Sequence, residues 1–84
     1  MSKDEDLRAL KAAYRVLEVV NGPKEWTDAI ERLAGRAAVA QGRWEIDRSA
    51  VGPLQAADEL MALAGDPPER RILQKLIARA PKGR

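Results

Sequence analysis

The chain has 84 residues, a formal net charge of +2, 45% apolar residues and 33% charged residues. This length supports a single domain, and the composition is that of a folded globule rather than a disordered segment. Because the sequence contains no Cys and no His, it excludes disulfides, thiolate and imidazole catalysis, and every metal site that depends on those ligands.

The first predicted helix covers residues 3–20. Ser2 and Glu5 have the spacing of a capping box at its start. Its apolar positions recur with helical periodicity and are Leu7, Leu10, Tyr14 and Leu17, with Ala13 and Val20 widening the stripe. We expect Gly22 to end the helix in a left-handed conformation, because Pro23 prevents its continuation.

The second predicted helix covers residues 24–41. Its apolar positions are Trp26, Ile30, Leu33, Ala37 and Ala40, which share one helical face. Gly35 lies inside this helix, where a glycine costs about 1 kcal/mol relative to Ala. We therefore expect another helix to cross closely at Gly35, and we expect Gly42 to follow the helix end.

Residues 43–52 are predicted to form an irregular connection. The alternation of apolar and charged residues at its start is typical of a strand, but a single strand in a helical protein pairs only with its copy in a dimer. We favour an ordered loop in which Trp44 and Ile46 contact the core. A short turn then starts at Asp47 or Ser49.

The third predicted helix covers residues 53–64 and begins at the break formed by Gly52 and Pro53. Its apolar positions are Leu54, Ala57, Leu60, Met61 and Ala64, which fit the helical period. Gly65 follows directly, so we expect the helix to end there.

The fourth predicted helix covers residues 67–80. Asp66, Pro67 and Glu69 have the order of a capping residue, a first-turn proline and an acid at the third position. Its apolar face consists of Leu73, Leu76, Ile77 and Ala80. Pro81 ends it, and we expect residues 81–84 to form a frayed basic tail.

Together the segments predict an all-α fold with one helical domain over residues 1–80. The fold class is a small bundle of about four short helices, roughly 3–20, 24–41, 53–64 and 67–80. There is no Phe, and the core depends on aliphatic residues and Ala, which bury little area per residue. A homodimer is therefore one way in which the core could be completed.

Basic side chains concentrate near the C-terminus, where residues 66–84 contain six basic and two acidic residues. On a helical wheel, Arg71, Lys75, Arg79 and Lys82 lie within about 80° of one another, opposite the apolar face. Three interpretations stay open: a solvated face that suits the helix dipole, a phosphate-binding surface for DNA or RNA, and a docking face for an acidic protein.

Trp44 is the second candidate binding residue. Folded against the edge of the core it is structural, whereas exposed on its loop it is an interface anchor. The candidate residues for binding a partner protein or a nucleic acid are therefore Arg71, Lys75, Arg79, Lys82, Arg70 and Trp44.

Catalysis is not expected. The hydroxyl side chains of Ser2, Ser49, Thr27 and Tyr14 have no His to activate them, and the carboxylate pairs Glu45/Asp47 and Asp58/Glu59 are typical of solvated surfaces. No phosphate-binding loop, calcium loop or membrane span is present in the sequence, so we expect no cofactor, no metal and no membrane.

These observations predict a small non-enzymatic regulatory or adaptor protein that binds another protein. The alternative is a nucleic-acid-binding regulator that uses the basic face of the last helix. A cytoplasmic location is the default expectation, and the preference for Ala and Arg suggests a bacterial or phage source.

Overall fold

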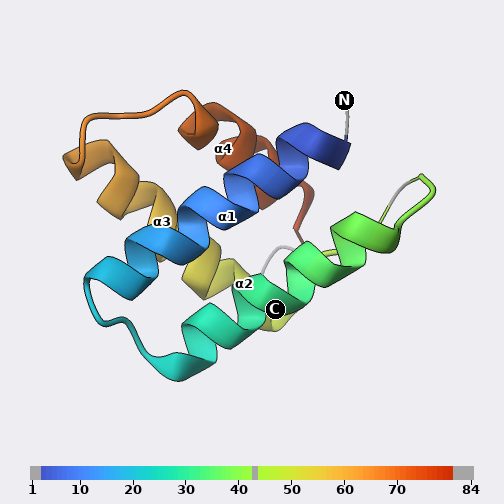
Figure 1. Cartoon of the computed structure of the whole chain (residues 1–84), viewed down its shortest axis with the longest axis horizontal. Coiled ribbons are helices and arrows are strands. Elements are labelled where there is room, and N and C mark those ends of the chain that lie inside the picture. Colours follow the sequence, from blue (N-terminus) through green and yellow to red (C-terminus); the bar gives the residue numbers. More distant parts are fainter. Residues whose placement is uncertain (1–2, 43, 81–84) are drawn as a thin grey trace.

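The computed structural model describes residues 3–42 and 44–80. Its elements, in chain order, are α1 (Lys3–Val19), α2 (Lys24–Val39), the short 3-10 helix η1 (Arg48–Ala50), α3 (Val51–Leu63) and α4 (Glu69–Arg79) (Figure 1). These residues contain no strand, so the predicted all-α bundle is confirmed. The expectations for Ser2, for Lys82 and for a tail over residues 81–84 lie outside the described residues.

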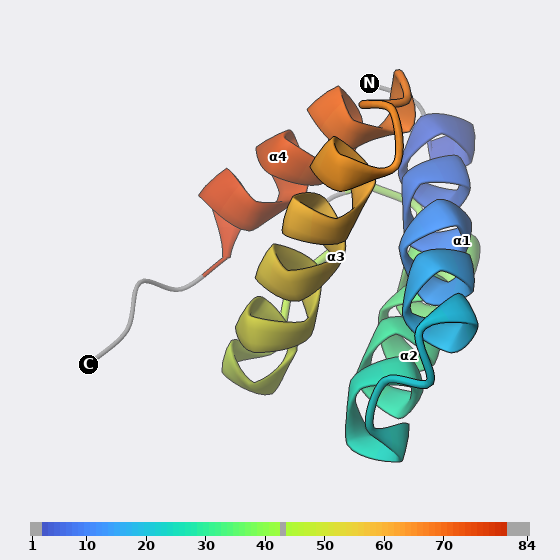
Figure 2. The ribbon, with the colours of Figure 1, turned by 90° about the vertical axis from the view of Figure 1, so that its left-hand side faces the viewer.

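The four α-helices form two layers, with α1 and α2 in one and α3 and α4 in the other (Figure 2). Within the described chain, α1 packs against each of the other three helices, whereas α2 and α4 share no contact. The first helix is therefore the central element, and the other helices are arranged around it.

The core consists of aliphatic side chains contributed by every helix. The largest fully buried side chains are Leu10, Leu17, Ile30, Leu33, Leu54, Leu73 and Leu76. Small residues such as Ala13 and Ala57 are also fully buried, which lets the helices approach closely. Val20 was expected in the apolar stripe but is 48% exposed, and it lies just beyond the end of α1 at Val19.

The end of α1 differs from the expectation in one residue. Asn21, with φ 56°, is the left-handed residue, rather than Gly22. The amide of Asn21 donates to the Glu18 carbonyl at 3.1 Å and that of Gly22 to the Leu17 carbonyl at 2.8 Å, which is the Schellman pattern. Glycine suits position 22 because a Cβ there would lie 3.2 Å from the Leu17 oxygen.

The start of α3 comes earlier than predicted. The turn η1 leads directly into a helix that begins at Val51, so Gly52 and Pro53 lie within its first turn rather than before it. A proline is tolerated there because the first amides of a helix have no intrahelical acceptor. The irregular connection therefore ends near Asp47 instead of at residue 52.

The end of α3 is formed as expected, but the start of α4 is not. Gly65 adopts φ 106°, and the amide of Asp66 donates to the Met61 carbonyl at 2.9 Å. Asp66 itself has φ 54° and does not cap α4. The capping position is Pro68, without a side-chain hydrogen bond, and the helix begins at Glu69.

The expected close helix crossing at Gly35 is wrong. Gly35 is exposed, and a Cβ added there would meet no atom within 4 Å outside its immediate backbone surroundings. The glycine lies on the outer side of α2, away from the face that buries Ile30, Leu33 and Ala37. No packing requirement therefore explains a glycine at this position.

The described part of the loop between α2 and η1 lies against the core, as expected, with Trp44 and Ile46 both buried. Arg36 fixes the loop to α2, because its Nη1 donates to Asp47 Oδ1 at 2.6 Å and to the Glu45 carbonyl at 3.3 Å. Asp47 is then the residue that precedes η1, which confirms the expected short turn.

Candidate protein-binding surface

Some cations of the predicted basic face of α4 form ion pairs within the protein, and others do not. Arg71 and Lys75 are exposed and form no ion pair with a described residue. Arg70 instead donates from Nη1 to Asp66 Oδ1 at 3.0 Å and from Nε to Asp58 Oδ1 at 2.9 Å. The hydrogen bonds to Asp66 and Asp58 raise the pKa of Arg70 above its ordinary value, so this side chain stays charged and ties α3 to α4.

Arg79 is also engaged within the fold rather than free on the basic face. Its Nη2 donates to the Trp44 carbonyl at 2.7 Å, and its guanidinium lies 5.0 Å from the centroid of the Trp44 ring. Its Nη1 lies 3.8 Å from Asp6 Oδ2. Trp44 is therefore enclosed by its own chain and does not serve as an exposed anchor.

Asp6 completes this arrangement, which we term the Asp6–Trp44–Arg79 cluster. The Trp44 indole Nε1 donates to Asp6 Oδ2 at 3.2 Å, and Asp6 is only 5% exposed. Its Oδ1 accepts no hydrogen bond from the described residues. The cluster connects the start of α1, the loop before η1 and the end of α4, which is a structural role.

A second set of cations lies on α1, and sequence reasoning missed it. Arg8, Lys11 and Arg15 are all exposed and fall within about 60° on a helical wheel, opposite the buried face of the helix. Across the described residues, none of the three forms an ion pair. We term these three residues the α1 basic ridge.

The ridge was overlooked because residues 1–42 are neutral overall, with the acidic residues of the first turn balancing the cations. The signal that could have found it is the spacing of Arg8, Lys11 and Arg15 at i, i+3 and i+7, which places them on one helical face. Net charge over a segment conceals such a stripe, because Asp4 and Glu18 lie on the same face of α1 at its two ends and balance part of its charge.

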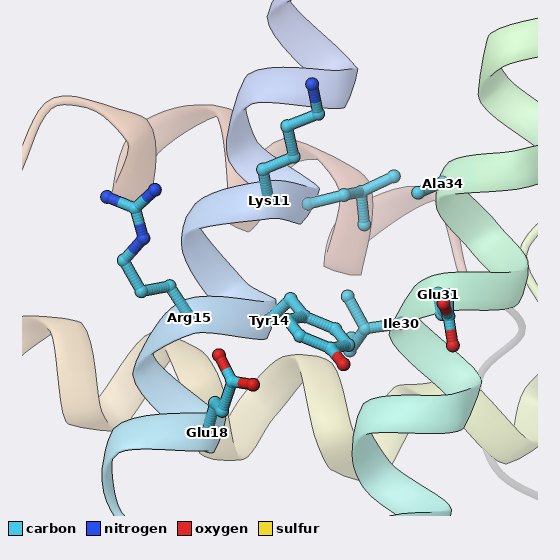
Figure 3. A pocket seen from close by; sticks show the side chains of 8 residues that line it. Lys11, Tyr14, Arg15, Glu18, Ile30, Glu31 and Ala34 are labelled. Carbon is cyan, nitrogen blue, oxygen red and sulfur yellow. The ribbon is translucent and has the colours of Figure 1, made fainter.

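Two hollows flank the ridge. The first lies between α1 and α2 and has a volume of about 420 Å³. The Tyr14 ring lies across it toward Ile30, as Figure 3 shows, while Leu10 and Ile30 beneath are fully buried. Because Lys11, Arg15, Glu18 and Glu31 also line it, this hollow carries both signs of charge beside its apolar residues.

The second hollow, of about 400 Å³, has the more apolar lining of the two. Its lining residues come from α1, from α3 and from the connection to α4, and they are Ala12, Val16, Val19, Met61, Ala64 and Pro67, with Arg15 and Glu69 at its border. We term it the α1–α3 groove. Val19 is 75% exposed in it, and Figure 3 shows Arg15 projecting from α1 on the side away from α2.

Three of the polar residues weighed for catalysis form contacts within the fold. The Thr27 hydroxyl donates to the Lys24 carbonyl at 3.1 Å, Ser49 Oγ accepts from Arg32 Nη2 at 3.4 Å, and Asp58 pairs with Arg70. In the ranges 3–42 and 44–80, no group of three or more acidic side chains is arranged to hold a metal ion. In the same ranges, no helix has the length and apolar character needed to cross a membrane.

No protein-family model, no curated protein and no solved structure matches this chain. Among the described residues, the surface features that could serve binding are two unpaired cations on α4, three on the α1 basic ridge and the apolar groove beside that ridge.

Proposed function

We propose that this protein is a non-catalytic adaptor or regulatory domain that binds a partner protein through the α1–α3 groove. The observation that carries the proposal is the groove itself, because Val16, Val19 and Pro67 leave apolar surface unburied beside an otherwise charged helix face. Contiguous apolar surface on a small domain is typical of a site where a protein partner docks.

The form of the groove supports a helical partner segment. Its lining residues belong to α1 and to the corner where α3 turns into α4, and a partner helix that presents a row of apolar side chains would cover them. Arg15 and Glu69 at the border supply charges of opposite sign, which orient a partner without requiring that either charge be buried.

The nucleic-acid alternative has less support from the same geometry. Arg70 and Arg79 are held by carboxylates or by Trp44, which leaves Arg71 and Lys75 as the free cations of α4 among the described residues. Two phosphate contacts on α4 supply little affinity at physiological salt, and the three cations of the α1 basic ridge lie on a different helix from the predicted basic face. We therefore place protein binding first and use nucleic-acid binding as an outcome of the tests below.

A matched pair of exposed valines tests the proposal. Val19 ends α1 in the groove, and Val39 ends α2 outside it with a similar exposed fraction of 79%. A photoreactive amino acid would be placed at position 19 or at position 39, and the crosslinked proteins from cells would be identified by mass spectrometry with and without nuclease.

The expected result is a partner crosslinked from position 19, absent from position 39, and unaffected by nuclease. The captured protein should also bind the purified domain directly, and binding should be lost in Val19→Ser and kept in Val39→Ser. Equal capture from both positions, or direct binding that ignores the Val19 substitution, would contradict the proposal.

A further inference from the structure

We propose that Asn21 is a site of spontaneous deamidation that the C-terminal end of α1 restrains, and that conversion of Asn21 to isoaspartate loosens the last turn of α1. The inference is independent of the proposed function, because it concerns a covalent change of the chain itself. It rests on the dipeptide Asn21–Gly22, on the exposure of Asn21 and on the hydrogen bonds of the two backbone amides.

The residue that follows Asn21 favours the reaction. Asn21 is the only asparagine in the sequence, and Gly22 comes directly after it. Because glycine has no Cβ, no side chain hinders the approach of its nitrogen to the preceding side chain. Gln41 also precedes a glycine, Gly42, and both are exposed. The longer side chain of Gln41 would have to close a larger and less readily formed ring, so Gln41 serves as an internal comparison.

The reaction needs only water as a second reactant. The Gly22 nitrogen attacks Asn21 Cγ, the bond between Cγ and Nδ2 breaks, and Nδ2 leaves as ammonia with the proton that the Gly22 amide gives up. One water molecule then opens the resulting succinimide ring. Addition of water at Cγ gives aspartate, whereas addition at the main-chain carbonyl carbon of residue 21 gives isoaspartate, in which the backbone runs through Cβ and Cγ.

The folded structure leaves the side chain accessible but holds the attacking nitrogen. Asn21 is exposed in the connection between α1 and α2 and has φ 56°. The amide of Gly22 donates to the Leu17 carbonyl at 2.8 Å. While this bond is intact, the Gly22 nitrogen keeps its proton and is fixed to α1. The end of α1 must therefore open before Asn21 reacts, and such local opening is more frequent than global unfolding.

Isoaspartate does not fit the native helix end. A Cβ on Gly22 would already lie 3.2 Å from the Leu17 oxygen, so there is little room for the backbone to shift toward the helix. The additional main-chain carbon of isoaspartate displaces Gly22, and its hydrogen bond to Leu17 cannot keep the native geometry. The last turn of α1, which carries Val19, then loses the contact that ends it.

The new charge acts in the same direction. Aspartate and isoaspartate both place a carboxylate at the C-terminal end of α1, where the helix dipole is negative. The last turn of α1 contains no basic residue, and Glu18 is exposed there. Charge therefore weakens the helix end in both products, whereas the displaced backbone is a property of isoaspartate alone.

The first experiment compares deamidation rates with hydrogen exchange. The full chain would be incubated folded in neutral buffer and unfolded in urea, and peptide mass spectrometry would follow Asn21 and Gln41. NMR would measure the exchange protection of the Gly22 amide, which reports how often its bond to Leu17 opens. We expect Asn21 to react roughly tenfold or more slowly in the folded chain, by a factor that matches the Gly22 protection, while Gln41 stays unchanged.

Two results would overturn the restraint by the helix end: equal rates in the folded and unfolded chains, or a slower folded rate that does not match the Gly22 protection. A folded chain in which Asn21 stays intact although the Gly22 amide exchanges would overturn the site itself. Asn21→Gln keeps a side-chain amide at this position and should show no conversion in the same incubation.

The second experiment isolates the product. Chromatography of the aged protein would separate the isoaspartate form, and Asn21→Asp would supply the same charge on a normal backbone. We expect the isoaspartate form to unfold at a lower urea concentration than Asn21→Asp. We also expect the NMR signals of Val19 to shift more than those of Val39 at the end of α2. Equal urea midpoints with an unshifted Val19 would show that isoaspartate does not loosen α1.

Discussion

At the scale of single residues, the most consequential contact joins Asp6 to Trp44, which are separated by 38 positions in the sequence. The first-turn position of Asp6 alone indicates a helix-dipole role. The fold instead buries its carboxylate, and the indole N–H and the Arg79 guanidinium become its partners. Asp6 Oδ1 has no donor among the described residues. The stability of the buried carboxylate therefore depends on the contacts that Oδ2 makes.

The first prediction follows from that cluster. Trp44→Phe keeps most of the apolar area but removes the N–H donor, so the buried Asp6 loses the hydrogen bond that the indole donates to it. We expect the free energy of unfolding to fall by about 1–3 kcal/mol, as for a buried polar group left without a partner. Urea unfolding at neutral pH measures the change.

The control is Trp26→Phe. Trp26 is half-buried at the edge of the core, and no hydrogen bond of its indole is found in the described structure. Its substitution should cost clearly less than that of Trp44. If the two variants lose the same stability, the hydrogen bond to Asp6 contributes nothing specific.

At the scale of elements, helix ends are decided by backbone conformation rather than by residue type. Asn21 and Gly65 take left-handed conformations, as the ends of α1 and α3 require, whereas Gly35 lies in regular helix on an exposed surface. Residues that commonly mark a helix end therefore meet different backbone requirements at these three positions. Substitutions to Ala should show this as different changes in the free energy of unfolding.

The second prediction contrasts two glycines. Gly35→Ala should raise the free energy of unfolding by about 0.5–1 kcal/mol, because Ala favours the helix and no atom opposes its methyl group. Gly65→Ala should lower it by about 1–2 kcal/mol, because φ 106° is unfavourable for a residue with a Cβ. Thermal and urea unfolding of both variants measure the two signs.

A loss of stability in Gly35→Ala would show that the outer side of α2 contacts something in solution that a methyl group obstructs, such as a second protein copy. Comparison at several protein concentrations distinguishes this case from a local effect, since only an intermolecular contact would make the unfolding midpoint depend on concentration.

At the scale of the whole molecule, stability depends on a thin core that is arranged around α1. A chain of this length is expected to have a free energy of unfolding of roughly 4–13 kcal/mol. Each fully buried leucine therefore represents a large part of the total, and the protein has little capacity to absorb the loss of one. Exposed leucines have no such role.

The third prediction compares Leu33→Ala with Leu63→Ala. Leu33 is fully buried in α2, and its truncation should cost about 2–5 kcal/mol. Leu63 is 85% exposed at the end of α3, and its truncation should change stability by less than about 0.5 kcal/mol. Circular dichroism during urea unfolding measures both, and similar losses would show that Leu63 is covered in solution, for example in an oligomer.

The ion pairs of Arg70 do not make the stability of the whole molecule depend strongly on pH near neutrality. The raised pKa of Arg70 means that its contribution to stability is present at every pH below its ordinary value. Loss would begin only as the pH rises through the raised value, which is above the range in which proteins are usually handled. The link between α3 and α4 is thus insensitive to alkalinity near neutral pH.

The sequence by itself determined the all-α class and the existence of the four helices. Their amphipathic periods are local and strong, and their boundaries differ from the predicted ones by about two residues at most. It also favoured a loop in which Trp44 and Ile46 contact the core, but it left an exposed Trp44 as the alternative, and only the structure shows both side chains buried. The same local information failed at Gly35, where a glycine has no structural requirement.

Only the tertiary structure decided which charges are free. The wheel of α4 places Arg79 beside Lys75, but packing brings Asp6 and Trp44 to Arg79, and Asp58 to Arg70. These partners come from other helices and from a loop, and no local pattern specifies such distances. Packing likewise created the α1–α3 groove from segments more than 40 residues apart, and so moved the candidate site from α4 to α1.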